Sequence, residues 1–327
     1  MPVSLAISDT DSDMTRPAFP FLSPSTPSVS PGLLQQARAL PTPRVALVNA
    51  GSPTALMGIQ EAAAAGLAEP VLIGDPDKIR TTAEHIGFDI GGIRIVDAPH
   101  ASAAPQAARL ARDGEVDAIM KGQIHSSTFL KGLLPAAAGL RDPGVRCGHV
   151  FHVTINGSDR ALLVTDAALN VDPSIATRKA CLVHAVRLAQ VLGVDRPNAA
   201  ILSPNEDPTP SIQNTMDAAE IAAWAKTSLP DAEVAGPLAL DLIFSREAAE
   251  IKGVTTPVAG DADIILTPNI TTGNAIVKLM VLGMGCCAGG LVLGAKVPIL
   301  LTSRSQGSAA RLASAALGAI AASGGMA

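Results

Sequence analysis

The feature that most constrains the fold is an alternation of short apolar segments with longer alanine- and leucine-rich amphipathic segments, which continues from residue 45 to residue 302. Near-continuous apolar strands separated by helices are typical of a parallel sheet that helices cover on both faces. The pattern predicts strands at residues 45–49, 71–73, 93–96, 116–120, 162–165, 200–203, 264–267, 291–293 and 298–302. It predicts helices that include residues 53–66, 103–113, 126–134, 174–192, 212–226 and 273–282. We therefore expect an α/β protein built from two doubly wound sheets.

Chain length and local composition indicate how the sequence is organised. A domain usually contains roughly 100–200 residues, so a chain of 327 residues predicts two domains. Residues 1–31 are rich in serine, proline, threonine and aspartate and show no sustained period. Such a segment buries too little surface to offset the entropy lost on ordering. We expect a flexible tail over residues 1–31 and a folded region that begins near Leu33.

Charge and composition disfavour two classes of partner. The chain has 24 lysine and arginine residues against 29 aspartate and glutamate residues, and only 2% of its residues are aromatic. It therefore lacks the basic surplus and the stacking side chains that nucleic-acid binding requires. Residues 279–295 carry no charge, but glycines interrupt them, so we interpret them as a helix, a turn and a buried strand rather than a membrane span. The N-terminus lacks the basic and apolar regions of a signal peptide.

Cysteine and histidine spacing disfavours a metal site. The cysteines are Cys147, Cys181, Cys286 and Cys287. They form no C-x-x-C pair, so we interpret them as reduced, buried thiols of a cytoplasmic protein. His149 and His152 would face opposite sides of a strand, which is unsuited to a shared metal ion. We expect no metal centre.

Polar residues follow several predicted strands, at the ends where open α/β sheets bind ligands. Lys121 and Gly122 end one strand, Ser126 and Thr128 open the next helix, and Lys131 follows on that helix. Helix-terminal N–H groups, hydroxyls and ammonium groups suit an anion such as phosphate. The alternative is an ordinary helix cap with a solvated lysine.

Three other strand-flanking sites carry charge. Ser303 and Arg304 follow the last predicted strand, where a guanidinium could hold a phosphate or a developing oxyanion, or could simply be solvated after a capping serine. Asp166 also follows a strand and is either a ligand contact or a helix cap. Asp261 and Asp263 precede a strand, where they could bind a cation or supply a base, or could form an Asx turn.

One helix face combines a lysine with an amide. Asn274 and Lys278 are four residues apart on an otherwise apolar helix, which suits the wall of a ligand site or leaves a solvated lysine. The sequence contains no G-x-G-x-x-G, G-x-x-x-x-G-K-[ST] or G-x-S-x-G motif.

These segments, in this order, resemble the phosphate acetyltransferase/phosphate butyryltransferase family from about Val45 to Ala315. The stretches that carry the resemblance are VDAIMKGQIHSSTFLKGLL, HVFHV, LLVTDAALNVDP, ILSPNEDPTP, GPLALD, IKGVTTPVAGDADIILTPNITTGNAIVKLM and GLVLGAKVPILLTSR. The resemblance implies two α/β domains flanking a cleft, similar to isocitrate and isopropylmalate dehydrogenases, with residues 32–150 and 298–327 in the first domain and residues 151–297 in the second. The implied reaction exchanges coenzyme A (CoA) and inorganic phosphate on an acyl group. A homodimer with no metal and no permanently bound cofactor is also implied, with CoA, phosphate and acyl phosphate as its small-molecule partners.

The resemblance also implies roles for the candidate residues. The pair Ser303 and Arg304 matches the family's donors to the oxyanion and phosphate, while Asn274 and Lys278 match a helix face that contacts CoA. The phosphate- and CoA-binding loop and helix are matched by Lys121, Gly122, Ser126, Thr128 and Lys131, and we group Asp166 with them. The CoA thiolate is implied to attack the acyl phosphate directly, so that no cysteine is needed.

Two departures from the family pattern concern the base. Many relatives carry an acidic residue soon after the Ser-Arg pair, whereas residues 305–311 contain none, and Thr272 replaces the acid that usually precedes Gly273. The proton of the thiol is therefore taken by Asp261, by Asp166 or by solvent. We expect Asp261 to matter most, because the glycine before it lets backbone approach a ligand.

The acyl group and the activity leave alternatives open. We expect transfer of an acetyl group, with a phosphate butyryltransferase as the alternative. A second alternative is a CoA-binding or regulatory protein that keeps the fold but is catalytically impaired. A dehydrogenase is disfavoured, because the metal-binding aspartates and the dinucleotide signature expected of one are missing.

Overall fold

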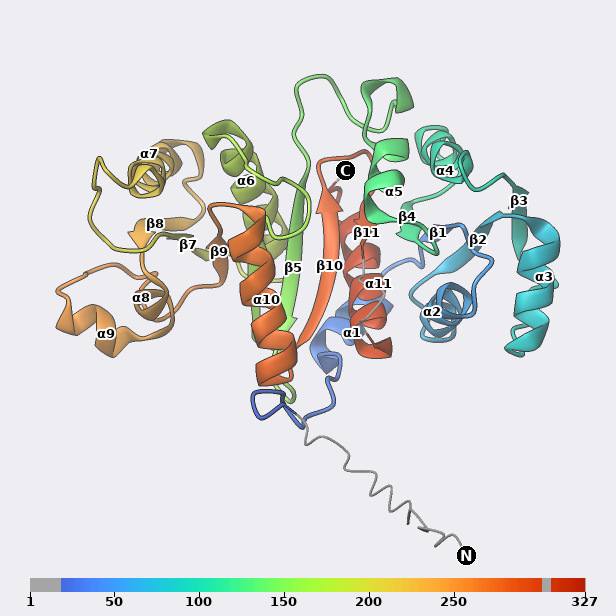
Figure 1. Cartoon of the computed structure of the whole chain (residues 1–327), viewed down its shortest axis with the longest axis horizontal. Helices are drawn as coiled ribbons and strands as arrows, with labels where there is room; N and C mark the ends of the chain where they lie inside the picture. The colour runs from blue at the N-terminus through green and yellow to red at the C-terminus, as the bar shows by residue number, and fades with distance from the viewer. Residues whose placement is uncertain (1–18, 302–306, 327) are drawn as a thin grey trace, which may run out of the picture.

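A computed structural model describes residues 19–301 and 307–326 of the chain. Its fold is mixed α/β, with one 11-stranded sheet in the order β3-β2-β1-β4-β11-β10-β5-β6-β9-β7-β8 (Figure 1). The strands are β1 (Arg44–Val48), β2 (Glu69–Gly74), β3 (Arg94–Asp97), β4 (Ala118–Lys121), β5 (Gly148–Thr154), β6 (Ala161–Thr165), β7 (Asn198–Leu202), β8 (Glu233–Leu238), β9 (Ile264–Leu266), β10 (Cys287–Leu293) and β11 (Ile299–Leu300). The helices are α1 (Pro31–Arg38), α2 (Pro53–Ala64), α3 (Pro76–His85), α4 (Ala103–Arg112), α5 (Ser126–Leu133), η1 (Ala136–Ala138), α6 (Ile175–Val191), α7 (Gln213–Ser228), α8 (Leu240–Phe244), α9 (Arg246–Ile251), α10 (Ile270–Met284) and α11 (Ser308–Ser323). The predicted α/β class is confirmed, but the strands form one continuous sheet rather than the two doubly wound sheets expected, because β5 and β10 pair with each other and join the two halves.

Two long antiparallel strands, β5 and β10, join the halves of the sheet. The strands β1, β2, β3, β4 and β11 are parallel to one another, and so are β6, β7, β8 and β9. Because β10 is antiparallel to β11 and β5 is antiparallel to β6, the parallel strands of the two halves run in opposite directions. Their carboxyl ends therefore point toward opposite edges of the sheet.

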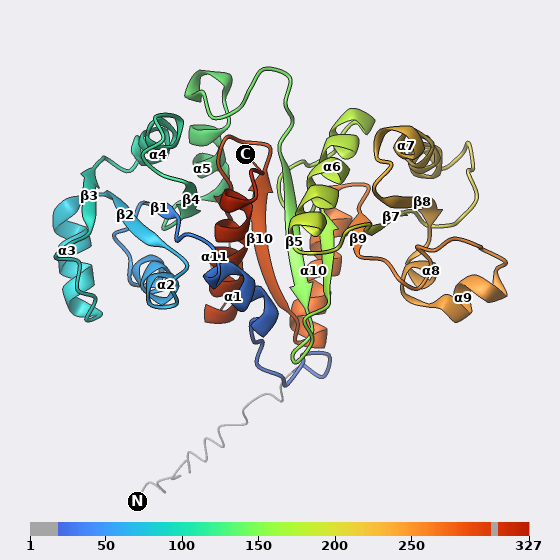
Figure 2. The same ribbon diagram turned by 180° about the vertical axis from the view of Figure 1, so that it is seen from behind.

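Helices cover both faces of the sheet, as the alternation predicts. On one face, α1, α2, α6 and α11 bury apolar side chains such as Leu56, Leu182 and Leu317 (Figure 2). On the other face, α4 and α5 cover the first half with Phe129, and α10 covers the second half with Val277 (Figure 1). Burying one such side chain fully is worth about 1.5–3 kcal/mol, so these contacts fix the helices on the sheet.

Side-chain caps mark where several helices begin. Ser52, Asp75, Ser174 and Asn269 each accept a backbone N–H from the first turn of α2, α3, α6 and α10, respectively. Proline follows the cap in α2 and α3, where its fixed φ suits the first helical position. Since each of these four helices begins after the carboxyl end of a strand, the caps also fix the loops at those ends.

The sequence patterns missed two strands for different reasons. All residues of β5 are buried, including His149 and His152, so the strand shows no alternation of polar and apolar faces. The edge strand β8 is largely half-buried and contains Gly236 and Pro237, which have low strand propensity. A pattern based on apolar runs cannot find either strand.

Residues 19–30 of the expected tail contact the folded region. Ser23 donates its N–H to the Leu282 carbonyl at 2.7 Å, and Ser28 donates its N–H to Oδ1 of Asn156 at 2.8 Å. Ser30 caps α1 and donates its hydroxyl to Asp159 at 2.7 Å. The structure thus differs from a tail that extends to residue 31, because these polar residues find partners around the β5–β6 turn and α10.

None of the helices in the described ranges has the length and apolar character needed to cross a membrane.

Candidate active site

A reversal of strand order in the first half marks a crevice. The chain runs from β1 outward to β2 and β3 and then returns to the other side of β1 as β4. Loops that leave two such strands diverge at the carboxyl ends, where α/β proteins bind ligands. A cavity of about 380 Å³ lies among these loops, lined by Lys78, His100, Gln123, Ile124 and His125. The lining offers one ammonium group and two imidazoles, which suits an anionic ligand.

The turn after β4 lies against β1, and Gly122 makes this possible. Its N–H donates to the Val48 carbonyl at 3.0 Å, and the N–H of Gln123 donates to the Asn49 carbonyl at 3.1 Å. A side chain at Gly122 would overlap the Val48 carbonyl oxygen, so the close approach requires glycine. Lys121, buried at the end of β4, directs its Nζ to the Gly122 carbonyl at 3.4 Å.

Helix α5 begins next to this turn. His125 is its N-cap residue, although its side chain does not cap the helix. The predicted residues Ser126, Thr128 and Lys131 are all exposed on α5. The predicted anion-binding residues of the β4–α5 segment therefore flank Gln123, Ile124 and His125, which line the cavity, but none of the predicted residues lines it. Helix-terminal N–H groups at the start of α5 add positive potential beside it.

Asp166 organises the loop that follows β6. Its Oδ1 accepts the N–H groups of Ala168 at 3.0 Å and Leu169 at 2.9 Å. Its Oδ2 accepts the side-chain amide of Asn170 at 2.6 Å and the backbone N–H groups of Asn170 and His149, both at 3.2 Å. The residue is only 2% exposed. Since both oxygens already accept several donors, Asp166 is built as a support for this loop.

His149 lies beside this loop in the centre of the sheet. Its ring packs edge-on against Phe151 with 4.3 Å between centroids and is fully buried. Burial lowers the pKa of His149 to about 4, although the charge of Asp166 and the carbonyl of Leu301 oppose this shift. The ring is therefore neutral near pH 7.

Asp261 lies at the amino ends of the second-half strands, opposite to the ends where Asp166 lies. It precedes the amino end of β9, whereas Asp166 follows the carboxyl end of the neighbouring parallel strand β6. Its Oδ1 accepts Nη2 of Arg160 at 2.6 Å, and the same guanidinium lies 3.6 Å from Asp263. The structure does not bring Asp261 together with Lys121 or Asp166. The sequence prediction placed Asp261 in the site from the two aspartates and the glycine. The sequence does not show at which end of the sheet the amino end of the following strand lies.

Helix α10 carries the remaining predicted pair. Asn274 donates its side-chain amide to the Ala167 carbonyl at 3.3 Å and so ties α10 to the loop organised by Asp166. Lys278 lies one turn further along the helix and is exposed. The two residues therefore differ in surroundings: the amide supports the loop, and the ammonium group is accessible.

Ser303 and Arg304 lie outside the described residues. The chain reaches them from β11, whose Leu300 pairs with Met120 of β4, so Leu301 follows beside Lys121. Across the long strands, Leu300 is also level with Thr165 through the pairs Leu300–Leu291, Leu291–Val150 and Val150–Thr165. In the order of strands, the end of β11 thus lies between β4, whose loop lines the cavity, and β6, which leads to Asp166.

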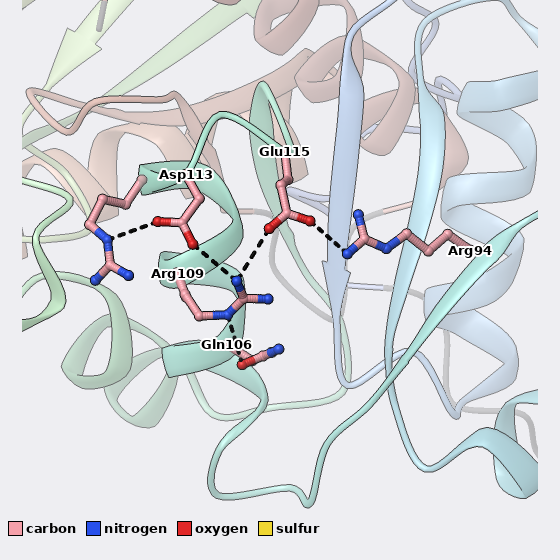
Figure 3. Close-up of polar contacts among 6 residues, drawn as sticks. Arg94, Gln106, Arg109, Asp113 and Glu115 are labelled. Atoms are coloured by element: carbon pink, nitrogen blue, oxygen red, sulfur yellow. Dashed lines mark hydrogen bonds and ion pairs between the residues drawn. The ribbon is translucent and has the colours of Figure 1, made fainter.

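A group of ion pairs lies away from the cavity, at the amino ends of the first-half strands (Figure 3). Arg94 pairs with Glu115 at 2.7 Å, and Arg109 pairs with Asp113 at 3.0 Å and Glu115 at 3.2 Å. The guanidinium groups lower the pKa of Glu115. Because these side chains are a third or more exposed, we assign them a minor structural role.

Sequence reasoning missed the cavity residues Lys78, His100 and His125. Lys78 belongs to the first turn of α3 and His100 follows β3, so neither stands next to another candidate in the sequence. His125 lies within the predicted KGQIHSST segment, and its position before the helix was the available signal. Among residues 19–301 and 307–326, no three His, Cys, Asp or Glu side chains converge as metal ligands would.

Comparisons with known proteins identify the family. The family described as phosphate acetyl/butaryl transferase matches residues 100–319. The chain is 38% identical over 300 residues to a phosphate acetyltransferase of Rhizobium meliloti, covering 91% of this chain and 94% of the relative. It is 36% identical over 290 residues to a phosphate butyryltransferase of Clostridium beijerinckii, covering 88% and 96%.

A solved structure agrees with these sequence matches. The branched-chain phosphotransacylase of Enterococcus faecalis V583 superposes with a TM-score of 0.74 at 28% identity, covering 85% of this chain and 99% of that one. The residues matched by the family, 100–319, include the β4–α5 turn and α10. The chain therefore belongs to the phosphate acetyltransferase/phosphate butyryltransferase family and is a phosphate acyltransferase.

Proposed function

We propose that this enzyme moves a short acyl group, preferentially acetyl, between CoA and inorganic phosphate. The observation that carries the proposal is the cavity at the strand-order reversal, lined by one ammonium group and two imidazoles, in a chain of this family. Both acyl phosphate and CoA present phosphate groups, which Lys78 and the first turn of α5 are placed to attract. CoA acts as a substrate, and no permanently bound cofactor is needed.

The proposed phosphate-binding elements are the β4–α5 turn and α5. Gly122 lets the turn lie close to β1, while Lys121 stands at the end of β4. The exposed Ser126, Thr128 and Lys131 would contact phosphate groups from the helix. We propose that Lys278 contacts a CoA phosphate and that Asn274 and Asp166 act by holding α10 and the loop 166–170 in place.

The reaction is proposed to proceed by direct transfer. The CoA thiolate attacks the carbonyl carbon of the acyl phosphate, an oxyanion forms, and the C–O bond to phosphate breaks as phosphate leaves with the electron pair. Ser303 and Arg304 are proposed to stabilise the oxyanion and the leaving phosphate. Fixed donors of this kind typically contribute ~10²–10³ in rate.

The cysteines support a mechanism without an acyl-enzyme. Cys147, Cys181, Cys286 and Cys287 are all free and buried. Burial raises the pKa of Cys147 to about 11 and that of Cys287 to about 11, and it also raises the pKa values of Cys181 and Cys286. Thiols with raised pKa values are poor nucleophiles near neutral pH. Free, buried thiols also fit our proposal that the enzyme works in the reducing cytoplasm.

We further propose two α/β domains that flank a cleft and a homodimeric assembly. The domains comprise residues 32–150 with 298–327 and residues 151–297, and the pairing of β11 with β4 supports the return of the C-terminal segment to the first domain. Exposed apolar residues near the C-terminal end of α10, including Phe21, Leu279 and Leu282, support a dimer contact. A monomeric mass in solution light scattering would contradict the dimer.

The acyl preference can be tested with a thiol-consumption assay on the full chain. Acetyl phosphate, propionyl phosphate and butyryl phosphate are supplied with CoA, and kcat/KM is measured for each. We expect the value for acetyl phosphate to exceed that for butyryl phosphate. One methylene is worth only about 1–3 kcal/mol in a pocket, so two methylenes give an expected ratio of roughly 30 to 10⁴. A higher value for butyryl phosphate would assign the chain as a phosphate butyryltransferase, and no activity with any of them would support an impaired CoA-binding protein.

A further inference from the structure

Asn49, the first residue after β1, has a backbone conformation that few side chains tolerate. Its φ is 56°, and among residues 19–301 and 307–326 it is the only non-glycine residue with a positive φ. The left-handed region brings Cβ close to the following carbonyl oxygen, and asparagine is one of the few residues besides glycine found there. The residue is also only 8% exposed. Residues held in such conformations cluster at functional sites, where the surrounding contacts keep them in place.

The left-handed conformation turns two consecutive carbonyl groups toward β4. The Val48 carbonyl accepts the N–H of Gly122 at 3.0 Å, and the Asn49 carbonyl accepts the N–H of Gln123 at 3.1 Å. In an extended strand, consecutive carbonyl groups point to opposite neighbours, whereas in a helical conformation they point the same way. The conformation of Asn49 therefore gives the turn after β4 two adjacent hydrogen bonds to the end of β1.

The side-chain amide of Asn49 contacts a different wall of the cavity. It donates to the His100 carbonyl at 3.4 Å, in the loop that follows β3. In the sheet, β3 lies beyond β2 on one side of β1, and β4 lies on the other side. His100 and Gln123 both line the cavity. One residue thus joins two loops that leave the sheet on either side of β1 and enclose the same cavity.

The third wall of the cavity, Lys78 of α3, contacts the loop that begins at Asn49. A Cβ atom at Gly51 would lie 3.0 Å from Cγ and Cδ of Lys78, so the lysine stem lies directly against this loop. Ala50 donates its N–H to the Ile73 carbonyl at 3.0 Å, which fixes the loop to the end of β2. Residues 49–51 therefore contact cavity residues from three separate segments of the chain.

We propose that Asn49 is a positioning residue for acyl transfer, an inference that rests on the proposed function. Its backbone and its amide set the distance between the loops after β3 and β4, and so the separation of the groups that meet the phosphates of acyl phosphate and CoA. Asn49 acts through these loops and does not touch the reacting atoms. A displacement of about 1 Å in such a site can cost ~10² in rate, because the reacting atoms then leave their attack geometry.

The test compares Asn49→Gly with Asn49→Ala in the full chain, well below the melting temperature of each variant. Glycine adopts the left-handed conformation freely, so Asn49→Gly loses the amide contact alone. Alanine loses the amide and also disfavours the backbone conformation that directs the carbonyl of residue 49 to Gln123. We expect kcat/KM for acetyl phosphate to fall about threefold to tenfold in Asn49→Gly, as for one lost hydrogen bond. In Asn49→Ala we expect a fall of ~10².

Asn198→Ala is the matched control. The Asn198 amide also donates to a backbone carbonyl, that of Asp261 at 3.1 Å, but at the amino ends of the second-half strands. This variant loses the same kind of hydrogen bond away from the cavity, so its melting temperature should fall while its kcat/KM stays within about twofold of wild type. Calorimetric titration with inorganic phosphate gives a second readout. The affinity should weaken from wild type to Asn49→Gly to Asn49→Ala and should be unchanged in Asn198→Ala.

The order of the two Asn49 variants separates positioning from general stability. At an ordinary strand position glycine is the more destabilising replacement, so a loss caused by stability alone would be larger in Asn49→Gly. That order, or unchanged kinetic constants in both variants, would overturn the positioning role while the wild-type chain stays active. If Asn49→Ala does not fold, a kcat/KM of Asn49→Gly equal to that of Asn198→Ala would overturn it. An inactive wild-type chain would instead overturn the proposed function itself.

Discussion

Arg304→Ala is expected to reduce kcat by ~10²–10³ while changing the KM for CoA by less than about threefold. The proposed partner of this guanidinium is the charge that develops on the carbonyl oxygen and on the departing phosphate, and that charge is largest in the transition state. Arg304→Lys should recover only part of the loss, because a point charge cannot make the two parallel hydrogen bonds of a guanidinium. Steady-state kinetics with acetyl phosphate and CoA measure both effects.

Arg160→Ala is the matched control for charge removal. Arg160 pairs with Asp261 at the far edge of the second half, so its loss should leave kcat unchanged. An Arg304→Ala enzyme that keeps more than half of the wild-type kcat would remove Arg304 from the mechanism.

Asp166→Asn is expected to lower both stability and activity, by the same factor at every pH. The carboxylate is buried and accepts hydrogen bonds from five N–H groups, whereas an asparagine amide would turn its own N–H groups toward donors such as the backbone N–H of His149. Leaving buried donors unpaired costs about 1–3 kcal/mol each. The loop 166–170 would loosen, and with it the anchor that Asn274 provides for α10. Denaturant unfolding and a pH–rate profile measure the two effects.

Asp261→Asn is the matched control for this substitution. Asp261 is 40% exposed, and an exposed ion pair contributes about 0–1 kcal/mol. We expect kcat within about twofold of wild type at pH 7, since a side chain at the opposite edge makes no contact with the reacting atoms. A large loss near pH 7 that recovers at higher pH would restore Asp261 as the base.

The sequence predicted the layered α/β fold because parallel strands buried on both faces are apolar throughout. This signal is strong for β1, β4 and β9, whose residues lie almost entirely in the core. It failed for β5, where two buried histidines interrupt the apolar pattern, and for β8, an edge strand with glycine and proline. The pattern also did not predict which strands pair antiparallel, because an apolar run has the same appearance in a parallel and in an antiparallel strand.

The candidate site was predictable where its residues are neighbours in the chain. Lys121, Gly122 and Ser126 lie within one turn, so a strand followed by a capped helix was enough to find them. Lys78 and His100 reach the cavity from other loops, and only the folded sheet brings them there. Asp261 and Asp166 show the reverse case. Both residues flank apolar strands. Asp261, however, precedes the amino end of β9, and both carboxylate oxygens of Asp166 already accept hydrogen bonds.

The measurement that tests direct transfer most sharply is exchange of labelled inorganic phosphate into acetyl phosphate by the full chain, with and without CoA. Direct attack by the CoA thiolate requires CoA before the bond to phosphate can break, so we predict rapid exchange with CoA present and none without it. Exchange in the absence of CoA would reveal an acyl-enzyme and contradict this account, as would the absence of exchange under both conditions.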